Sequence, residues 1–244
     1  ADVAIVGTDF YFGDGGSFGL LFQARNNTMF AADLKRQRSD RLGKKDGTTE
    51  TKLTIGGRDA LLLSSPDGSV RSYYVADGDY HFVTTSKTLA ERFLETGSGK
   101  GSLGASKEFR HARSVMPTSR KDTVFVYLSD AFFRNFTSPR YRLEAARRIQ
   151  SLADLEMVQL AQHVSATEGK PDDAIEELIA GGFLPPGFGP RPDGSRPVLQ
   201  NDDAYDSLRG RRGSFIPVPD VPVDQVTRSE VEWFGDFANF YRSE

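Results

Sequence analysis

The first third of the chain alternates short apolar segments with turn residues. Glycine, proline and aspartate separate the segments, and they supply the positive or fixed φ angles that tight reversals need. Because a parallel crossover needs about a dozen residues or more, strands this close together are expected to pair antiparallel. The pattern predicts a hairpin formed by residues 3–12 and 20–25 around a glycine-rich turn, and then a meander. The meander strands are expected near residues 50–55, 59–64, 70–75 and 80–85.

Helical periodicity marks several helices before Pro139. Each begins at a residue whose side-chain oxygen can accept a hydrogen bond from a free backbone N–H of the first turn. The expected caps are Thr28, Ser86, Ser106 and Ser129. Between the last two helices, the β-branched and aromatic run Thr123–Leu128 predicts a central strand of the sheet.

A long helix is expected from Pro139 to about Thr167. Its later part is acidic, and the basic residues of its first turns are Arg140, Arg142, Arg147 and Arg148. This order opposes the helix dipole, which favours acidic residues at the N-terminus. We therefore expect a neighbouring element or a partner to compensate the arginines. A second, acidic helix is expected at about residues 172–180.

The composition changes after residue 182. Eight of the 12 prolines lie between Pro185 and Pro222, a density that excludes helices and interior strands. Apolar residues are interspersed along this arm, so we expect it to lie extended across a folded surface rather than to form a disordered linker. The capping box Thr227-Arg228-Ser229-Glu230 then opens a helix rich in aromatic residues.

Together these elements predict an α+β fold. Its antiparallel sheet would contain the N-terminal hairpin, the meander and the strand 123–128, with helices mainly on one face. Residues 1–182 are expected to form the core domain. Residues 183–244 are expected to form a proline-rich strap and an aromatic amphipathic helix, which dock either on that core or on a partner.

Composition narrows the possible functions. The chain has 244 residues, no cysteine and a net charge of −3. Without cysteine there can be no disulfide, thiol nucleophile or cysteine-based metal site. A slightly acidic chain is not expected to have nucleic acid or an anionic membrane as its main partner, and no apolar run is long enough to span a bilayer. The chain does not begin with Met, and its first residues, ADVAIV, already read as a strand, so we expect a mature chain or a piece of a longer protein.

Two serines are candidates for catalysis. Ser17 lies in Gly15-Gly16-Ser17-Phe18-Gly19, which matches the nucleophile-elbow motif, and Ser129-Asp130 follows the end of the strand 123–128. An elbow requires a helix after the serine, whereas the next residues read as a strand. A glycine-rich hairpin turn therefore explains the motif better, with a hydrolase or transferase site near Ser17 or Ser129 and Asp130 as the alternative.

Other polar clusters lack the spacing that a ligand site needs. The loop Gly97–Ser102 resembles a phosphate loop but follows a helix instead of a strand. The three histidines show no metal-binding spacing. Asp202, Asp203 and Asp206 lack the glycine of a calcium loop and are expected at a solvated hairpin turn. The sequence therefore indicates no catalytic set, cofactor or metal.

The helix after Thr28 carries a candidate binding surface. Residues 35–45 hold six basic residues and one acidic residue, a net charge of +5, and the candidates for binding are Lys35, Arg38 and Arg41. Such a face could meet phosphate, nucleic acid or an acidic partner. No aromatic residue is interleaved for base stacking, so a solvated face is the preferred interpretation.

The C-terminal helix carries a second candidate surface, which includes Trp233, Phe237 and Phe240. Its aromatic residues cover more than one helical stripe. A helix that is apolar over this width is either buried on two sides or binds another chain.

A resemblance covers Asp79–Phe136, under a quarter of the chain. This segment combines a strand ending in Thr-Ser, a helix, the small-residue stretch 101–106, Phe109, a helix ending near Pro117 and the aromatic strand 124–128. In this pattern it resembles an uncharacterised bacterial domain family, a domain of unknown function found in large exported or envelope-associated proteins. The resemblance implies a mixed α and antiparallel β fold and an exported or cell-envelope location, but no catalytic residue. The proline-rich arm and the aromatic helix depart from the family pattern.

The leading hypothesis is a non-catalytic interaction or structural domain of a larger bacterial assembly. It would bind a protein partner, or self-associate, through residues 183–244. The alternatives are the hydrolase or transferase described above and anion or nucleic-acid binding through residues 35–45.

Overall fold

The computed structural model describes residues 3–11, 14–44, 46–119, 124–170, 174–200 and 203–243. The chain forms two compact units. Unit 1 consists of Ala1–Tyr11, Gly16–Pro66 and Val70–Ser138, and unit 2 of Phe12–Gly15, Asp67–Ser69 and Pro139–Glu244. The main boundary therefore lies at Ser138 and not near residue 182, because the long helix after Ser138 packs with the proline-rich arm.

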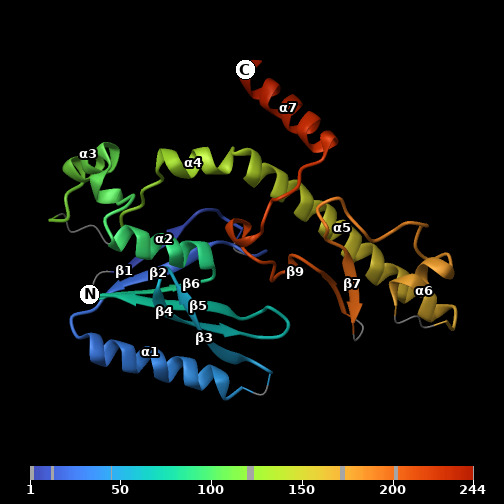
Figure 1. Ribbon diagram of the computed structural model, residues 1–244, viewed down its shortest axis with the longest axis horizontal. Helices are drawn as coiled ribbons and strands as arrows, with labels where there is room; N and C mark the ends of the chain where they lie inside the picture. Colours follow the sequence, from blue (N-terminus) through green and yellow to red (C-terminus); the bar gives the residue numbers. More distant parts are fainter. Residues whose placement is uncertain are drawn as a thin grey trace. The chain divides into compact units, whose positions relative to one another are not determined.

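Unit 1 contains a six-stranded antiparallel sheet in the order β1-β2-β6-β5-β4-β3 (Figure 1). β1 and β2 form the predicted hairpin, and β3 to β6 form the predicted meander. Pairing of β2 with β6 joins the two into one sheet. The strands are β1 (Val3–Gly7), β2 (Phe18–Gln23), β3 (Thr49–Ile55), β4 (Arg58–Ser64), β5 (Arg71–Asp77) and β6 (Tyr80–Thr84).

The described helices of unit 1 are α1 (Asn27–Leu42), α2 (Lys87–Gly97), α3 (Lys107–Val115) and α4 (Asp130–Phe136), with a 3-10 turn at Leu103–Ala105. Ser86, Ser106 and Ser129 accept the predicted cap hydrogen bonds from first-turn N–H groups. α1 is capped by Asn26 instead of Thr28, because the Asn26 side chain accepts from the Met29 N–H. The α+β class and the antiparallel sheet are confirmed.

Helices cover both faces of the sheet in unit 1, whereas the sequence predicted helices mainly on one. α2 packs on one face, and α1 lies on the other (Figure 1). The buried cluster under α2 comprises Ile55, Ala60, Val75, Phe82, Leu89, Ala90 and Leu94. On the α1 face, the Phe30 ring of the helix packs against Phe22 and His81 at centroid distances of 5.1 and 4.8 Å.

The buried His81 joins α1 to the sheet through a chain of hydrogen bonds. The Asn27 amide donates to Gly78 O and Asp79 Oδ1, so its oxygen is left to accept from His81 Nε2 at 3.2 Å. Nδ1 then accepts from the Tyr74 hydroxyl at 2.8 Å, which fixes the neutral tautomer. Burial lowers the pKa of His81, in keeping with this role. The histidine therefore positions α1 and is not free for catalysis.

Residues 124–128 do not join the sheet, contrary to the sequence prediction; Thr123 lies outside the described residues. Their side chains do alternate as a strand's would. Phe125 and Tyr127 pack on Phe109 of α3 at 6.3 and 5.1 Å, whereas Val124 and Val126 are each 75% exposed. The apolar pattern is thus satisfied on one side by a helix, without strand pairing.

Unit 2 is built on α5 (Pro139–Thr167), which confirms the predicted long helix. The sequence predicted an extended arm. The arm instead forms a small antiparallel sheet in the order β7-β8-β9. Pro197 is tolerated there because it begins an edge strand, where a missing N–H costs little. The remaining elements are α6 (Ile175–Ala180), β7 (Pro197–Gln200), β8 (Asp203–Asp206), β9 (Gly210–Arg211), a 3-10 turn at Val218–Asp220 and α7 (Arg228–Ser243).

The arm contributes to the core of unit 2. Leu184, Ala204 and Phe215 are at most 2% exposed and belong to one cluster with residues of α5 and α6. The first part of residues 183–244 therefore packs in cis. Among the described residues, no helix combines the length and the apolar character that crossing a membrane requires.

Candidate functional site

The predicted serine sites do not form active-site geometry. Ser17 is fully buried, its N–H donates to Asp9 Oδ1 at 3.2 Å, and β2 follows it directly, so the motif is a hairpin turn and not an elbow. Ser129 caps α4 by accepting from the Phe132 N–H at 3.0 Å. Asp130 pairs with Arg134 at 2.7 Å on an exposed surface. These residues act as turn and cap.

The basic residues predicted as a binding face on α1 differ in exposure and in pairing. Lys35 is exposed, as a binding residue must be. Arg38 is only 8% exposed, because its guanidinium pairs with Glu50 of β3 at 2.5 Å. Arg41 pairs with Asp46. Two of the three predicted contact residues are therefore already neutralised within unit 1.

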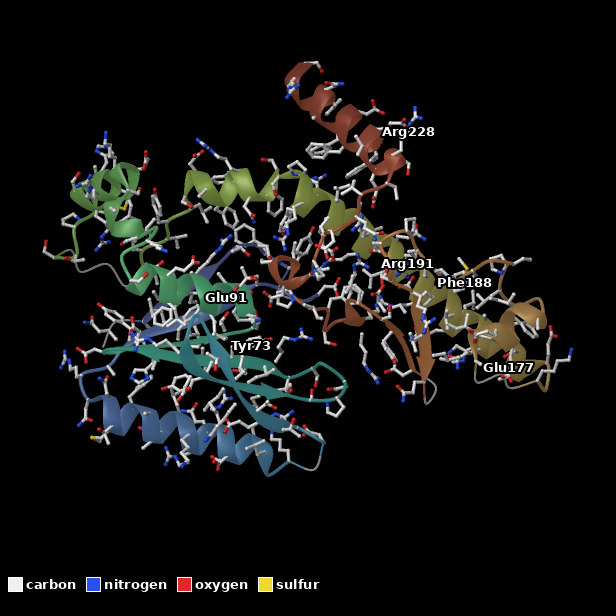
Figure 2. The ribbon with its side chains drawn as sticks, in the orientation of Figure 1. Tyr73, Glu91, Glu177, Phe188, Arg191 and Arg228 are labelled. Atoms are coloured by element: carbon white, nitrogen blue, oxygen red, sulfur yellow. The ribbon has the colours of Figure 1, made fainter. Side chains whose placement is uncertain are left out.

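A shallow pocket of about 410 Å³ lies beside α2. Its charged lining includes Arg58, Asp77, Glu95 and Glu91, which Figure 2 labels on the helix. Arg58 pairs with Asp77 at 3.1 Å. The described residues hold no cluster of three or more histidine, aspartate or glutamate side chains placed to bind a metal. Ser98 also lines this pocket, and its hydroxyl donates to the Glu95 backbone carbonyl at 2.7 Å instead of to a carboxylate.

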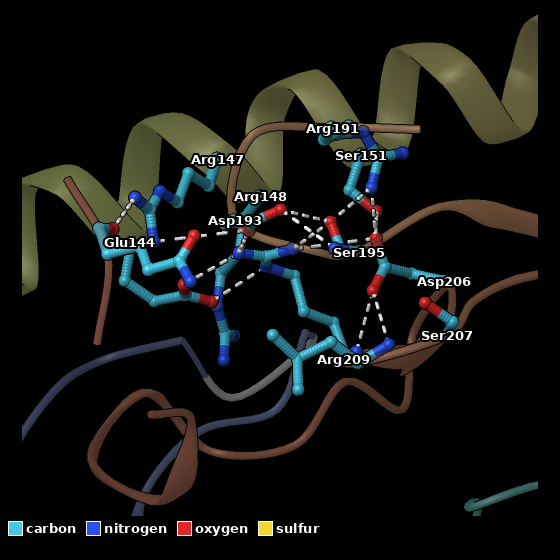
Figure 3. A network of polar contacts seen from close by, with 12 residues as sticks. Glu144, Arg147, Arg148, Ser151, Arg191, Asp193, Ser195, Asp206, Ser207 and Arg209 are labelled. Carbon is cyan, nitrogen blue, oxygen red and sulfur yellow. Dashed lines mark hydrogen bonds and ion pairs between the residues drawn. The ribbon is translucent and has the colours of Figure 1, made fainter. Parts of the chain in front are cut away.

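Unit 2 contains a buried polar network centred on Arg209 (Figure 3). Arg209 is 0% exposed and grips Glu144 of α5 with two bonds, of 2.9 and 3.0 Å. The same guanidinium reaches Asp193 Oδ2 at 2.6 Å and Ser195 Oγ at 3.0 Å. A bidentate pair of this kind fixes both position and orientation. It ties the loop before β7 and the turn after β8 to one side of α5.

Arg191 extends the network along α5. Its Nε donates to Asp154 at 2.8 Å, and its Nη1 donates to Asp206. Asp206 also accepts from Ser151 of α5 at 2.8 Å and, through its other oxygen, from the N–H groups of residues 208 and 209. Asp206 is 1% exposed, so it is not the solvated turn residue that the sequence predicted. Asp203 lies in β8, and Asp202 lies outside the described residues.

The arginines at the start of α5 hold the last part of the arm. Arg140 donates to the carbonyls of Pro219 and Val221 at 3.0 and 3.1 Å. Arg148 donates to the Ile216 carbonyl and to Glu144. An extended, proline-rich segment has carbonyl acceptors without matching N–H donors, and guanidinium groups supply those donors.

Arg147 fixes the beginning of α7. It makes a bidentate pair with Glu230 at 2.7 and 3.0 Å and donates to the Gln225 carbonyl at 2.6 Å. Glu230 also completes the predicted capping box, since it accepts from the Thr227 N–H at 2.8 Å. One carboxylate therefore caps α7 and anchors it to α5.

The electrostatics of the network fit a permanent ion-pair lattice. Burial raises the pKa of Asp193, but hydrogen bonds from Ser195 and Arg209 outweigh burial and hold the pKa at about 2. The hydrogen bond from Arg147 lowers the pKa of Glu230. Burial lowers the pKa of Arg209, but its bonds to Glu144 and Asp193 outweigh burial and raise it. Asp193 and Glu230 thus stay ionised at neutral pH, whereas a general acid or base needs a pKa near the working pH.

One feature of the sequence pointed to this network, namely the four arginines in the first turns of the long helix. The predicted compensation comes from the arm of the same chain. Asp154, Arg191, Asp193, Asp206 and Arg209 were not recognised as partners, because contacts between residues 15 to 65 positions apart leave no local pattern.

The aromatic residues of α7 differ in their surroundings. Phe237 lies under the Arg142 guanidinium, 4.3 Å from its ring centroid, and stacks with Trp233 at 6.0 Å. Trp233 and Phe240 are 41% and 61% exposed. Of the predicted contact residues on this helix, Phe237 is thus used in packing, whereas Trp233 and Phe240 lie on the surface.

α5 has an exposed apolar stripe of its own, which consists of Ile149, Met157, Leu160 and Val164. These residues are spaced by 8, 3 and 4 positions, so they share one helical face, and each is at least 40% exposed. The opposite face packs into the core of unit 2.

Comparison with protein-family models, curated proteins and solved structures finds no match for this chain. The family resemblance of residues 79–136 therefore stays a prediction.

The Arg209 lattice can be tested by removing its central charge. Arg209→Met is expected to destabilise unit 2 by about 3–5 kcal/mol, because it leaves the carboxylates of Glu144 and Asp193 buried without the guanidinium that pairs with them. Urea unfolding followed by the fluorescence of Trp233, the one tryptophan of the chain, measures the change. Arg212→Met is the control, since Arg212 and Glu156 form a pair that is 62% and 57% exposed and worth less than about 1 kcal/mol. Equal effects of the two variants would contradict the lattice.

The lowered pKa of Asp193 predicts a specific pH dependence. A carboxylate with a folded pKa below its unfolded value stabilises the fold above the unfolded pKa, and this contribution disappears as pH falls through the folded pKa. Asp193→Asn should therefore cost about 2 kcal/mol at pH 5, from the difference between 3.8 and about 2, and progressively less toward pH 2. Trp233-monitored urea unfolding between pH 5 and 2.5 measures it. The exposed Asp236→Asn is the control, and a cost that stays constant with pH would refute the account.

Proposed function

We propose that this protein is a non-catalytic interaction module, in which α5 and α7 of unit 2 present a protein-binding surface. The proposal rests on one observation: large apolar side chains are exposed on two helices that ion pairs and core packing hold in place. Trp233 and Phe240 supply aromatic surface on α7, and the stripe from Ile149 to Val164 supplies aliphatic surface on α5. Exposed apolar patches on ordered elements are typical of binding sites.

The buried network supports this function by holding the surface in place. The Arg147–Glu230 pair and the ring contact of Arg142 with Phe237 fix the first half of α7 on α5. The C-terminal end of α7 projects away from α5 (Figure 1). A helix that is anchored at one end and exposed at the other can enter a groove of a partner without a large ordering cost.

The spacing of the α5 stripe favours an amphipathic helix as the partner element. Residues on one helical face fit into the grooves of another helix, and Trp is a residue type that often dominates binding energy. The resemblance of residues 79–136 supports extending the proposal to an exported or envelope-associated bacterial assembly.

The geometry does not favour the two alternatives. Ser17 and Ser129 have structural roles, and both ring nitrogens of His81 are engaged by Tyr74 and Asn27. Of the three basic candidates on α1, only Lys35 lacks an ion pair among the described contacts.

Photo-crosslinking tests the proposed surface. A benzophenone side chain in place of Phe240 is expected to give a discrete adduct with one protein in cells that make this chain. The same group in place of Phe133, which is exposed to a similar degree on α4 of unit 1, should give none. Identical adducts from both positions, or none from position 240, would contradict the proposal.

With the partner purified, Trp233→Ser should weaken binding by about tenfold or more, while the melting temperature falls only by what the lost stacking on Phe237 costs. Truncation after Gly182 is not suitable for this purpose, because it removes Leu184 and Phe215 from the core of unit 2.

A further inference from the structure

The outer strand of the sheet in unit 1 is unprotected. β1 has the sequence VAIVG, and all five of its residues are exposed. Val3, Ile5 and Val6 are 57%, 75% and 39% exposed. In the described part of the chain, β2 is the strand that pairs with β1, so the other edge of β1 carries open backbone groups. Exposed, apolar edge strands are templates for pairing with a further strand.

The register shows which groups face outward. The Thr8 N–H donates to the Ser17 carbonyl at 3.0 Å, so the Thr8–Ser17 pair is a hydrogen-bonded one. Hydrogen-bonded and open pairs alternate along an antiparallel ladder. Val6 and Ala4 therefore bond to β2, and the N–H and C=O groups of Val3, Ile5 and Gly7 point away from the sheet.

The opposite edge of the same sheet is protected. β3 has the sequence TETKLTI, with Glu50 and Lys52 among its exposed residues, and Arg38 pairs with Glu50 at that edge. Charged side chains of this kind disfavour strand addition. The two edges of the sheet therefore differ in their capacity to accept another strand.

We propose that β1 pairs antiparallel with β1 of a second copy of this chain. The outward groups are symmetric about Ile5, so a two-fold axis at Ile5 places Ile5 opposite Ile5 of the second copy and Val3 opposite Gly7. In this register all three outward residues form hydrogen-bonded pairs, which gives six backbone hydrogen bonds. The strand has no charged residue, so the like-with-like pairing meets no repulsion.

The symmetry also explains why the assembly stops at two copies. A two-fold contact uses the same surface on both subunits and closes on itself. The remaining edges of the joined sheet are the two charged β3 strands. The contact is short, so the dimer is expected to be weak and dependent on concentration.

Cysteine crosslinking tests the register, because the natural chain has no cysteine to interfere. Residues in a hydrogen-bonded antiparallel pair have Cα atoms about 5.5 Å apart, within the range that a disulfide spans. Ile5→Cys is expected to give a covalent homodimer under mild oxidation. Lys52→Cys, on the exposed β3 edge, is the control and should give little. Equal dimer yields, or none from Ile5→Cys, would overturn the proposal.

A charge at the centre of β1 provides an independent test. Ile5→Lys should abolish the dimer seen by analytical ultracentrifugation between about 10 µM and 1 mM, and leave the melting temperature unchanged because Ile5 is exposed. Ile149→Lys is the matched control, since Ile149 is 70% exposed on α5 of unit 2. Loss of the dimer with Ile149→Lys but not with Ile5→Lys, or a wild-type protein that stays monomeric throughout this range, would refute the pairing of β1.

Discussion

The arginine side chains that join α5 to the arm are the interaction on which unit 2 depends. Proline removes N–H donors from the arm, so its carbonyls outside the short β7-β8-β9 sheet need donors from elsewhere. The guanidinium groups of Arg140, Arg147 and Arg148 supply donors to those carbonyls. Arg209 brings a charge from the arm to Glu144 of the helix. Buried charges of this kind are tolerated when they are paired and hydrogen-bonded. Arg147, Arg148 and Arg209 each pair with a carboxylate, whereas Nη2 of Arg191 is buried without a hydrogen-bond partner among the described residues.

The arginine lattice also gives a physical reason why unit 2 has charged residues in its interior and apolar residues on its surface. Charged residues share the interior contact between α5 and the arm with the apolar cluster around Val158 and Phe215, whereas other apolar residues such as Leu160, Trp233 and Phe240 lie on the surface. Paired charges are directional, so they define one arrangement of helix and arm. Apolar surface is less directional and suits contact with another molecule. Unit 1 also exposes apolar residues, at its edge strand β1, where open backbone groups face solvent. The other edge of the sheet is the charged strand β3.

The sequence predicted those parts of the fold that local chemistry determines. The meander followed from turn residues, and the caps at Ser86, Ser106 and Ser129 followed from side chains that can reach a nearby N–H. The run 124–128 has the composition of a strand, but Phe109 offers its aromatic residues a helix surface, and strand pairing is a non-local event that composition does not determine. The chain divides into its two units at Ser138, and not near residue 182, for a related reason. Proline density marks where backbone hydrogen bonding changes, whereas the unit is defined by which segments pack together.

The candidate binding residues were predicted from their residue types, and the fold determines which of them are exposed. Trp233 and Phe240 are exposed as binding residues should be, whereas Phe237 packs under Arg142. Arg38 lies in a basic run, yet its position on α1 directs it to Glu50 and buries it. The Arg209 cluster was not predicted, because its members come from α5, the loop before β7 and the turn after β8. The one indication in the sequence was the arginines at the N-terminus of α5, whose charge opposes the helix dipole and therefore requires partners.

Native-state hydrogen exchange of unit 2 tests the central claim most directly, because it measures the opening free energy of each amide. If the arginine lattice makes the arm an integral part of the unit, the amides of β8 and of residues 215–216 should open with the same free energy as the buried turn of α5 around Val158. Arm amides that open far more readily than those of α5 would show that the arm is only loosely attached, and would contradict the account.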